Sequence, residues 1–352
     1  MDGIADRGEA AAGTRRLAFT FTGTAGAYFG IWIVNLLLSI VTFGVYTAWA
    51  KVRRVRYFYG NTWLDGHNFE YHARPMQILI GRIAVVAALV VYNLLATVSP
   101  FFVALILPYL VALPWLINKS FAFNARMTSY RNIRFNFIGS YWGAFRAFIL
   151  WPFAAALTIG ILLPLASRSV HNYIGNNLRF GTAAFATASP LRSLYRLWGF
   201  CAVFAAILLL PVGAAIYALI GRLGTPDQSA FGGFVVIAAL FAYLGIFLVA
   251  ISYRAGARNV AYSATTLDGV HRLASRVGPV RYVFILVTNL FAAMFTSGLM
   301  IPWGAVRTWR YLASHTSLIA AGPLDGFVDE AGLGGNVAAA EYFDVQGIEF
   351  GL

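Results

Sequence analysis

Long apolar runs alternate along the chain with shorter stretches that are rich in arginine. A membrane-spanning helix needs about 20 mainly apolar residues. Seven segments have about this length, and they lie near residues 28–50, 77–97, 100–118, 141–166, 195–220, 231–253 and 280–304. Two neighbouring pairs are separated only by Ser99-Pro100 and by a Gly/Pro loop at 224–226, which predicts two helical hairpins. The pattern predicts a mainly α, polytopic membrane protein.

The arginine-rich stretches carry strand-like patterns. Residues 16–21 and 133–137 alternate polar and apolar side chains, as half-buried strands do. Asp65-Gly66 is a strong signal for a type I′ hairpin turn, and Asp268-Gly269 repeats it. Because an open sheet edge cannot face lipid, we expect short β-hairpins in the basic loops at the membrane surface.

An internal repeat organises these segments. A shift of 254 positions aligns residues 35–57 with 289–311 with nine identities in 23 positions, and a shift of 116 aligns a second copy. The segments then group as three, three and one: repeat one at about 16–118, repeat two at about 132–253 and a partial repeat three at about 270–320. We interpret 28–320 as the membrane domain, preceded by a polar segment with a short strand at 1–27 and followed by an acidic, flexible tail at 321–352.

The composition supports the membrane assignment. Hydrophobic residues make up 60% of the 352 positions and charged residues 11%, whereas soluble domains are about 45–50% apolar and about 25% charged. The net charge of +13 is therefore attributed to contact with anionic lipid headgroups and to cytoplasmic retention of the loops, not to nucleic acid. Cys201 is the single cysteine, and neither a metal-ligand spacing nor a catalytic constellation is present. We expect no cofactor, no metal and no enzymatic activity.

The charge distribution conflicts with seven simple crossings. The loops at 51–76, 118–140, 167–196 and 254–281 all carry several arginines, so all four should be cytoplasmic. A single crossing by residues 141–166 would place the last two outside. The first segment of each repeat therefore either breaks and returns to the same side, or is an ordinary span whose glycine allows close packing. The break candidates are the residues of a recurring Thr-x-Gly, namely Thr42, Gly44, Thr158, Gly160, Thr296 and Gly298.

One stretch of the chain resembles a known family. The run Trp49-Ala50-Lys51-Val52-Arg53, followed by Arg56-Tyr57-Phe58 and by Leu64-Asp65-Gly66, resembles the YjgN-type family of bacterial inner-membrane proteins. The resemblance covers about residues 16–352. It implies a multi-pass protein of the bacterial inner (cytoplasmic) membrane and no established activity, since the family is a domain of unknown function.

Arginines interleaved with aromatic residues are the candidate site for a ligand or lipid headgroup. The chain has 24 Arg and two Lys, and the guanidinium group binds phosphate in a bidentate manner. The repeat singles out Trp49, Arg53, Arg56, Tyr57, Trp303, Arg307, Arg310 and Tyr311. The alternative is that these arginines only mark topology and that the aromatic residues form an interfacial belt.

Polar groups inside the apolar segments are a second set of candidates. Asn35, Asn93 and Asn289 either form interhelical hydrogen bonds or line a substrate path. The leading hypothesis is a membrane protein that transports or binds a small anionic or amphipathic ligand or lipid. The alternative is a non-transporting scaffold that recruits partners, so far unknown, through the basic cytoplasmic hairpins and the acidic tail.

Overall fold

The computed structural model of the chain describes residues 14–223 and 228–322. The helices are α1 (Ala25–Val41), α2 (Thr47–Gly60), α3 (Pro75–Val98), η1 (Pro100–Leu105), α4 (Ile106–Met127), α5 (Tyr141–Phe145), η2 (Arg146–Leu150), α6 (Trp151–Leu157), α7 (Leu163–Asn177), α8 (Leu191–Leu223), α9 (Gln228–Ser263), α10 (Pro279–Phe295) and α11 (Ile301–Ser314). The strands are β1 (Arg15–Ala18), β2 (Thr20–Phe21), β3 (Thr62–Leu64), β4 (His67–Tyr71), β5 (Thr128–Tyr130), β6 (Ile133–Phe137), β7 (Leu178–Phe180), β8 (Ala183–Thr187), β9 (Thr265–Leu267), β10 (His271–Ser275) and β11 (Thr316–Ala320).

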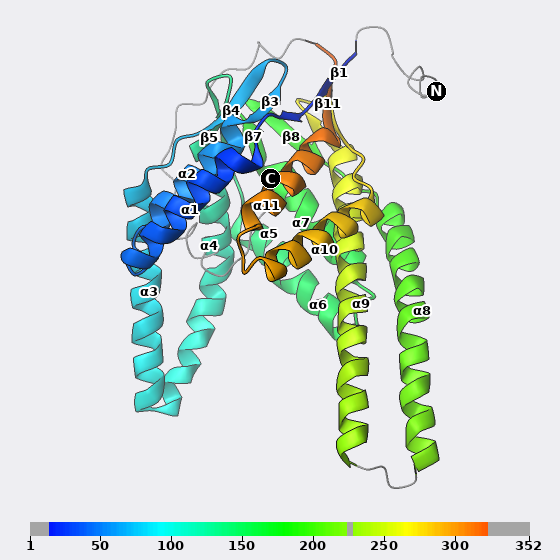
Figure 1. Cartoon of the computed structure of the whole chain (residues 1–352). Coiled ribbons are helices and arrows are strands. Elements are labelled where there is room, and N and C mark those ends of the chain that lie inside the picture. The colour runs from blue at the N-terminus through cyan, green and yellow to red at the C-terminus, as the bar shows by residue number, and fades with distance from the viewer. Residues whose placement is uncertain (1–13, 224–227, 323–352) are drawn as a thin grey trace.

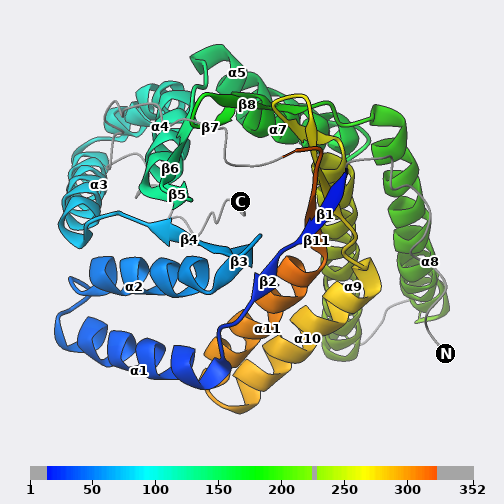
Figure 2. The ribbon, with the colours of Figure 1, turned by 90° about the horizontal axis from the view of Figure 1, so that it is seen from above.

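All eleven described strands belong to one antiparallel sheet, in the order β1-β11-β10-β9-β8-β7-β6-β5-β4-β3-β2. The two ends of this order, β1 and β2, are separated in the chain only by Phe19, so the strands follow one another round a ring (Figure 2). Each hairpin therefore pairs with the next instead of standing alone. The short β-hairpins expected in the basic loops are present, and lateral pairing joins them into one sheet, which satisfies edges that lone hairpins would leave open.

The ring has its own apolar core. Large side chains from strands far apart in sequence pack together inside it, among them Leu17, Leu64, Tyr130, Phe180, Leu267 and Leu318. The hairpin turns contain residues in the left-handed conformation: Asp65 and Gly66 both have positive φ, and so do Asp268 and Gly269. Two consecutive residues with positive φ are what a type I′ turn requires.

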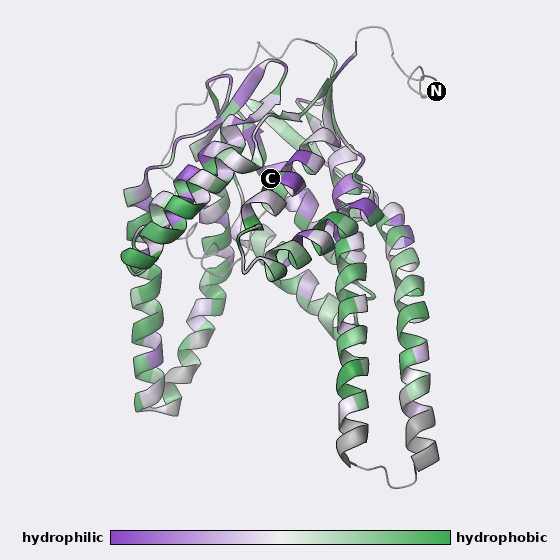
Figure 3. Cartoon of the chain, in the orientation of Figure 1, coloured by the Kyte–Doolittle hydropathy of each residue, from purple (hydrophilic) through white to green (hydrophobic). Residues whose placement is uncertain are grey.

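Two helical hairpins extend from the ring to one side, α3 with α4 and α8 with α9 (Figure 1). Three helical stretches in the described part of the chain are long and apolar enough to cross a membrane: Pro75–Val98, Leu191–Ala215 and Gly233–Ser263. Hydrophobic residues predominate along the described parts of both hairpins (Figure 3). The expected count of about seven spanning segments is therefore not confirmed.

The segments expected at 28–50, 141–166 and 280–304 are not continuous helices. Each is bent into two helices, which we name the three bent helix pairs: α1 with α2, α5–η2–α6 with α7, and α10 with α11. Helix α1 has 17 residues and so rises about 25 Å, which is less than the roughly 30 Å of a hydrocarbon core.

The three bends are built alike around Thr42, Thr158 and Thr296. In each, the threonine ends the first helix, the residue after it has φ of 48, 51 or 50°, and the following glycine has φ of 89, 84 or 91°. Glycine adopts this left-handed conformation without steric penalty. The threonine hydroxyl donates back to the carbonyl four residues earlier, and it accepts the N–H four residues later, at the start of the second helix.

The bent pairs and the hairpins alternate round the molecule. Helix α2 packs on α3, α4 on α5, α7 on α8 and α9 on α10, and the circle closes where α11 packs directly on α1. Above this joint β1 pairs with β11, with Leu17 opposite Leu318. The first and last parts of the membrane domain thus meet without an intervening hairpin. The predicted acidic tail and the Gly/Pro loop at 224–226 lie outside the described residues, apart from the first two residues of the tail, 321 and 322.

Because β4 and β8 belong to one sheet, we expect reporter proteins fused after Glu70 and after Phe185 to be found on the same side of the membrane. Paired reporters that are active on opposite sides of the membrane provide the measurement. Reporters on opposite sides would contradict the fold, because the second bent helix pair would then have to cross the membrane once.

Candidate functional site

A tyrosine in the second helix of each bent pair holds the start of the first helix. The Tyr57 hydroxyl donates to Thr24 O at 2.7 Å and accepts from Thr24 N at 2.8 Å. The Tyr311 hydroxyl donates to Gly278 O at 3.3 Å and accepts from Gly278 N at 3.0 Å. Tyr57 and Tyr311, predicted from the sequence as headgroup ligands, therefore both clamp their own helix pair.

The second pair has a related contact, in which the Tyr173 hydroxyl lies 2.5 Å from Asn118 Oδ1 and 2.9 Å from Ser140 O. Burial raises the pKa of Tyr173 to about 12. The hydroxyl therefore stays protonated at every physiological pH and continues to donate its hydrogen bond.

The candidates on α2 are engaged in structural contacts. Arg56 donates from Nε to Tyr71 O and from Nη2 to Ala73 O, both at 3.1 Å, which ties α2 to the end of β4 and the residues after it. The Trp49 ring stacks on Tyr46 with centroids 6.0 Å apart, and the Arg53 guanidinium lies 5.6 Å from the centroid of the same Tyr46 ring. Neither of the two cavities described below includes these residues.

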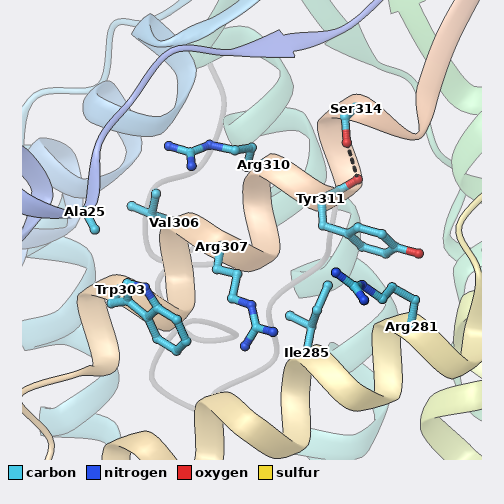
Figure 4. Close-up of a pocket in the computed structure, with 9 residues that line it drawn as sticks. All are labelled: Ala25, Arg281, Ile285, Trp303, Val306, Arg307, Arg310, Tyr311 and Ser314. Atoms are coloured by element: carbon cyan, nitrogen blue, oxygen red, sulfur yellow. Dashed lines mark hydrogen bonds between the residues drawn. The ribbon is translucent and has the colours of Figure 1, made fainter.

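The matching candidates on α11 line a cavity of about 350 Å³ between α1, α10 and α11 (Figure 4). We name it the arginine pocket. Its lining residues are Ala25 from α1, Arg281 and Ile285 from α10, and Trp303, Val306, Arg307, Arg310, Tyr311 and Ser314 from α11. The pocket lies at the joint where the first and last bent pairs meet.

Arg307 is held firmly in the middle of the pocket. Its Nη1 donates to Thr288 Oγ1 at 2.6 Å and to Asn289 Oδ1 at 3.1 Å. Its guanidinium lies 5.0 Å from the Trp303 ring centroid and 5.8 Å from that of Phe284, which are favourable cation–π distances. Among the described residues, hydrogen bonds from Arg307 are found only for Nη1.

Asn289 positions this arginine. Its Nδ2 donates to Gly304 O at 3.0 Å and to Thr308 Oγ1 at 2.9 Å, so its Oδ1 faces Arg307. A Cβ at Gly304 would lie 3.1 Å from Asn289 side-chain atoms, so the glycine allows α10 and α11 this close approach. Asn289 thus has the interhelical role that the sequence left as one of two alternatives.

The other two asparagines of the apolar segments lie elsewhere. Asn93 is exposed on α3 and donates to Leu89 O of its own helix at 2.8 Å. Asn35 is 7% exposed, and its Oδ1 has no hydrogen-bond partner among the described residues. Asn35 matches Asn289 in the repeat, and Arg53 matches Arg307. Arg307 donates a hydrogen bond to Asn289, whereas Arg53 lies over the Tyr46 ring and does not bond to Asn35 Oδ1.

Two further arginines complete the pocket. Arg310 donates from Nη2 to Gly23 O at 2.7 Å and so joins α11 to the residues before α1. Arg281 lies 5.8 Å from the Phe284 ring centroid. The sequence analysis did not single out Arg281. Its spacing of four residues from Ile285, on the same helix face, could have indicated a shared lining.

The pocket has an excess of positive charge. The acidic side chains in residues 14–223 and 228–322 are Asp65, Glu70 and Asp268. Asp65 pairs with Arg15 and Arg131 at 2.8 Å, and Glu70 lies 3.5 Å from His72. Within these ranges no carboxylate pairs with a pocket arginine, so three guanidinium groups face one cavity without an acidic partner.

An apolar cavity of about 440 Å³ adjoins the pocket, which we name the apolar groove. It is lined by Ala25, Gly26, Phe29, Thr296, Leu299, Met300 and Trp303, and it shares Ala25 and Trp303 with the arginine pocket. A Cβ at Gly26 would meet nothing within 4 Å, so this glycine leaves the groove open. The site thus combines a cationic end and a hydrophobic end.

Residues 16–345 match a family described as "Bacterial protein of unknown function (DUF898)". The chain is similar to the inner membrane protein YjgN of Salmonella typhimurium strain LT2, with 25% identity across 85% of this chain and 87% of the relative. YjgN of Escherichia coli O157:H7 is 31% identical over 158 residues, which cover 44% of this chain and 39% of the relative. YjgN of E. coli K12 is 30% identical over 43% of this chain and 38% of the relative. No solved structure matches the chain.

We expect Tyr311→Phe to lower the free energy of unfolding by about 1 kcal/mol, because it removes the two hydrogen bonds to Gly278. Thermal unfolding in detergent micelles measures the change. Tyr195→Phe is the matched control, since no hydrogen bond of the Tyr195 hydroxyl is found within the described structure. Equal effects of the two substitutions would contradict the clamp.

Proposed function

Because the chain belongs to the DUF898 family of bacterial proteins, whose relatives are inner membrane proteins, we propose that it binds an anionic, amphipathic membrane lipid between α1, α10 and α11. The protein is itself a bacterial inner-membrane protein with apolar helices able to span the bilayer. The lipid headgroup occupies the arginine pocket, and an acyl chain occupies the apolar groove.

The observation that carries this proposal is the excess of guanidinium groups in the pocket. Arg307 is oriented by Thr288 and Asn289, and its Nε and Nη2 donors, which bond to no residue that the structure describes, would face the ligand. Arginine binds phosphate through two parallel hydrogen bonds, and it does so more strongly away from bulk water. A phosphate-bearing headgroup supplies the negative charge that the described residues of the pocket lack.

The adjoining groove favours a lipid over a free anion. Its lining is almost entirely apolar, and Trp303 forms the boundary between groove and pocket. Tryptophan is favoured where one end of a site is polar and the other apolar. A soluble anion would leave the groove unused, whereas an acyl chain would fill it.

The contrast between the matched arginines favours one binding site over a symmetric transport path. Arg307 lines the pocket, but its counterpart Arg53 lies over Tyr46. The similar Thr-x-Gly bends support an internal repeat, and on this proposal only its third copy has become a ligand site. The scaffold alternative has less support, because the hairpins that would recruit partners pair with one another in the sheet.

We expect the double variant Arg281→Gln, Arg307→Gln to weaken the binding of anionic phospholipid about tenfold or more, because each lost charge-assisted hydrogen bond contributes about 1.5–3 kcal/mol. Native mass spectrometry of the detergent-solubilised protein, titrated with phosphatidylglycerol, measures the affinity. Arg192→Gln is the control, since Arg192 is exposed at the start of α8. An unchanged affinity of the double variant would refute the site and favour the scaffold alternative.

A second substitution tests the acyl-chain end. Gly26→Phe should fill the groove and weaken binding of the long-chain lipid, while binding of inorganic phosphate or of a short-chain analogue is retained. Gly30→Phe is a matched control, because Gly30 lies one turn further along α1, is equally open and does not line the groove. If Gly26→Phe leaves lipid binding unchanged, the groove does not hold the acyl chain, and the placement of a lipid across pocket and groove is refuted.

A further inference from the structure

The tips of the first two bent helix pairs expose large apolar side chains at strained positions. Phe43 is 99% exposed with φ of 48°, and Ile159 is 95% exposed with φ of 51°. A non-glycine residue is uncommon in this conformation, and a β-branched one is an outlier. In water neither residue would gain any burial to offset that strain.

The residues around all three tips are uniformly uncharged. The tips comprise residues 40–47, 156–163 and 294–301, and none of the three contains Asp, Glu, Lys or Arg. The flanking apolar side chains are also exposed, among them Val41, Leu157, Met294 and Phe295. Transfer of such surface from water to hydrocarbon is favourable by about 25 cal/mol per Å².

The backbone of each tip satisfies its own donors. In the first tip, the N–H groups of Thr42, Phe43, Gly44, Val45 and Thr47 bond to nearby backbone carbonyls, and that of Tyr46 bonds to Thr42 Oγ1. The second tip repeats this pattern from residue 158 to 163 and the third from 296 to 301. An aqueous loop has water for these donors, whereas in hydrocarbon each unsatisfied group costs several kcal/mol.

The depth of the tips follows from the fold. Both helices of a pair lead back to the same strand ring, and among the described elements the hairpins α3–α4 and α8–α9 extend further from it (Figure 1). We propose that the three tips insert into one leaflet only, the leaflet next to the strand ring, where they contact acyl chains. The far leaflet is then crossed by the two hairpins alone, so the protein displaces more lipid from one leaflet than from the other.

Single cysteines introduced in a Cys201→Ala background test the insertion in reconstituted vesicles. Nitroxides at Phe43→Cys and Ile159→Cys should be accessible to oxygen, protected from a water-soluble nickel chelate, and no deeper than about 15 Å into the hydrocarbon, which is one leaflet. Ser99→Cys, between α3 and η1, should react with an impermeant thiol reagent from the far side, and Glu70→Cys from the ring side. Reaction of the tip cysteines from the far side, or chelate access equal to that of Glu70→Cys, would overturn the proposal.

A charge at a tip provides an independent readout. We expect Ile159→Asp to lower the yield of folded protein extracted from membranes about tenfold, because a carboxylate is costly in hydrocarbon. Val270→Asp is the matched control, since Val270 is exposed at the β9–β10 turn of the ring, away from the tips. Equal losses would overturn the insertion. Lipid binding at the arginine pocket is measured separately, so either proposal can fail alone.

Discussion

Backbone N–H and C=O groups need hydrogen-bond partners wherever the chain leaves water, and this requirement explains both unusual parts of the fold. The first is the strand ring, in which every described strand pairs on both sides except at the break between β1 and β2. The second is the Thr-x-Gly bend, in which one hydroxyl links the end of one helix to the start of the next. In both, the backbone partners come from the chain itself, so neither needs the surrounding water.

The same two devices create the candidate site. Pairing of β1 with β11 brings the two ends of the membrane domain together, and α1 then packs on α11 without a hairpin between them. The bend at Thr296 turns α11 back along α10, which brings Arg307 next to Asn289 and Thr288. A cationic pocket and an apolar groove therefore meet at Trp303, at the joint of the ring.

Local features of the fold can be read from the sequence, because their physical causes lie within a few residues. The Asp-Gly turns and the helical hairpins are of this kind. Closure of the strand ring cannot be read from the sequence in this way, because it pairs Leu17 with Leu318, which lie about 300 residues apart. Nor did the length of an apolar run distinguish a span from a bent pair: residues 28–50 are long enough to cross, yet the helix ends at Val41.

Only part of the candidate site could be predicted from the sequence. The repeat indicated two equivalent arginine sets, and the cavity is formed by the set on α11 together with Arg281, which lies outside the aligned segment 289–311. The difference arises from neighbours: α11 faces α1 across the joint, whereas α2 faces the α3–α4 hairpin. Equivalent residues thus have different surroundings, which no comparison of the repeats alone could indicate.

Amide hydrogen exchange of the protein in lipid nanodiscs, followed residue by residue across the three bends, tests the central claim most directly. If the bends satisfy their own backbone donors within hydrocarbon, the amides of residues 42–47, 158–163 and 296–301 exchange as slowly as those inside the hairpin α8–α9. Exchange of these amides as fast as that of a solvent-exposed loop would contradict the account.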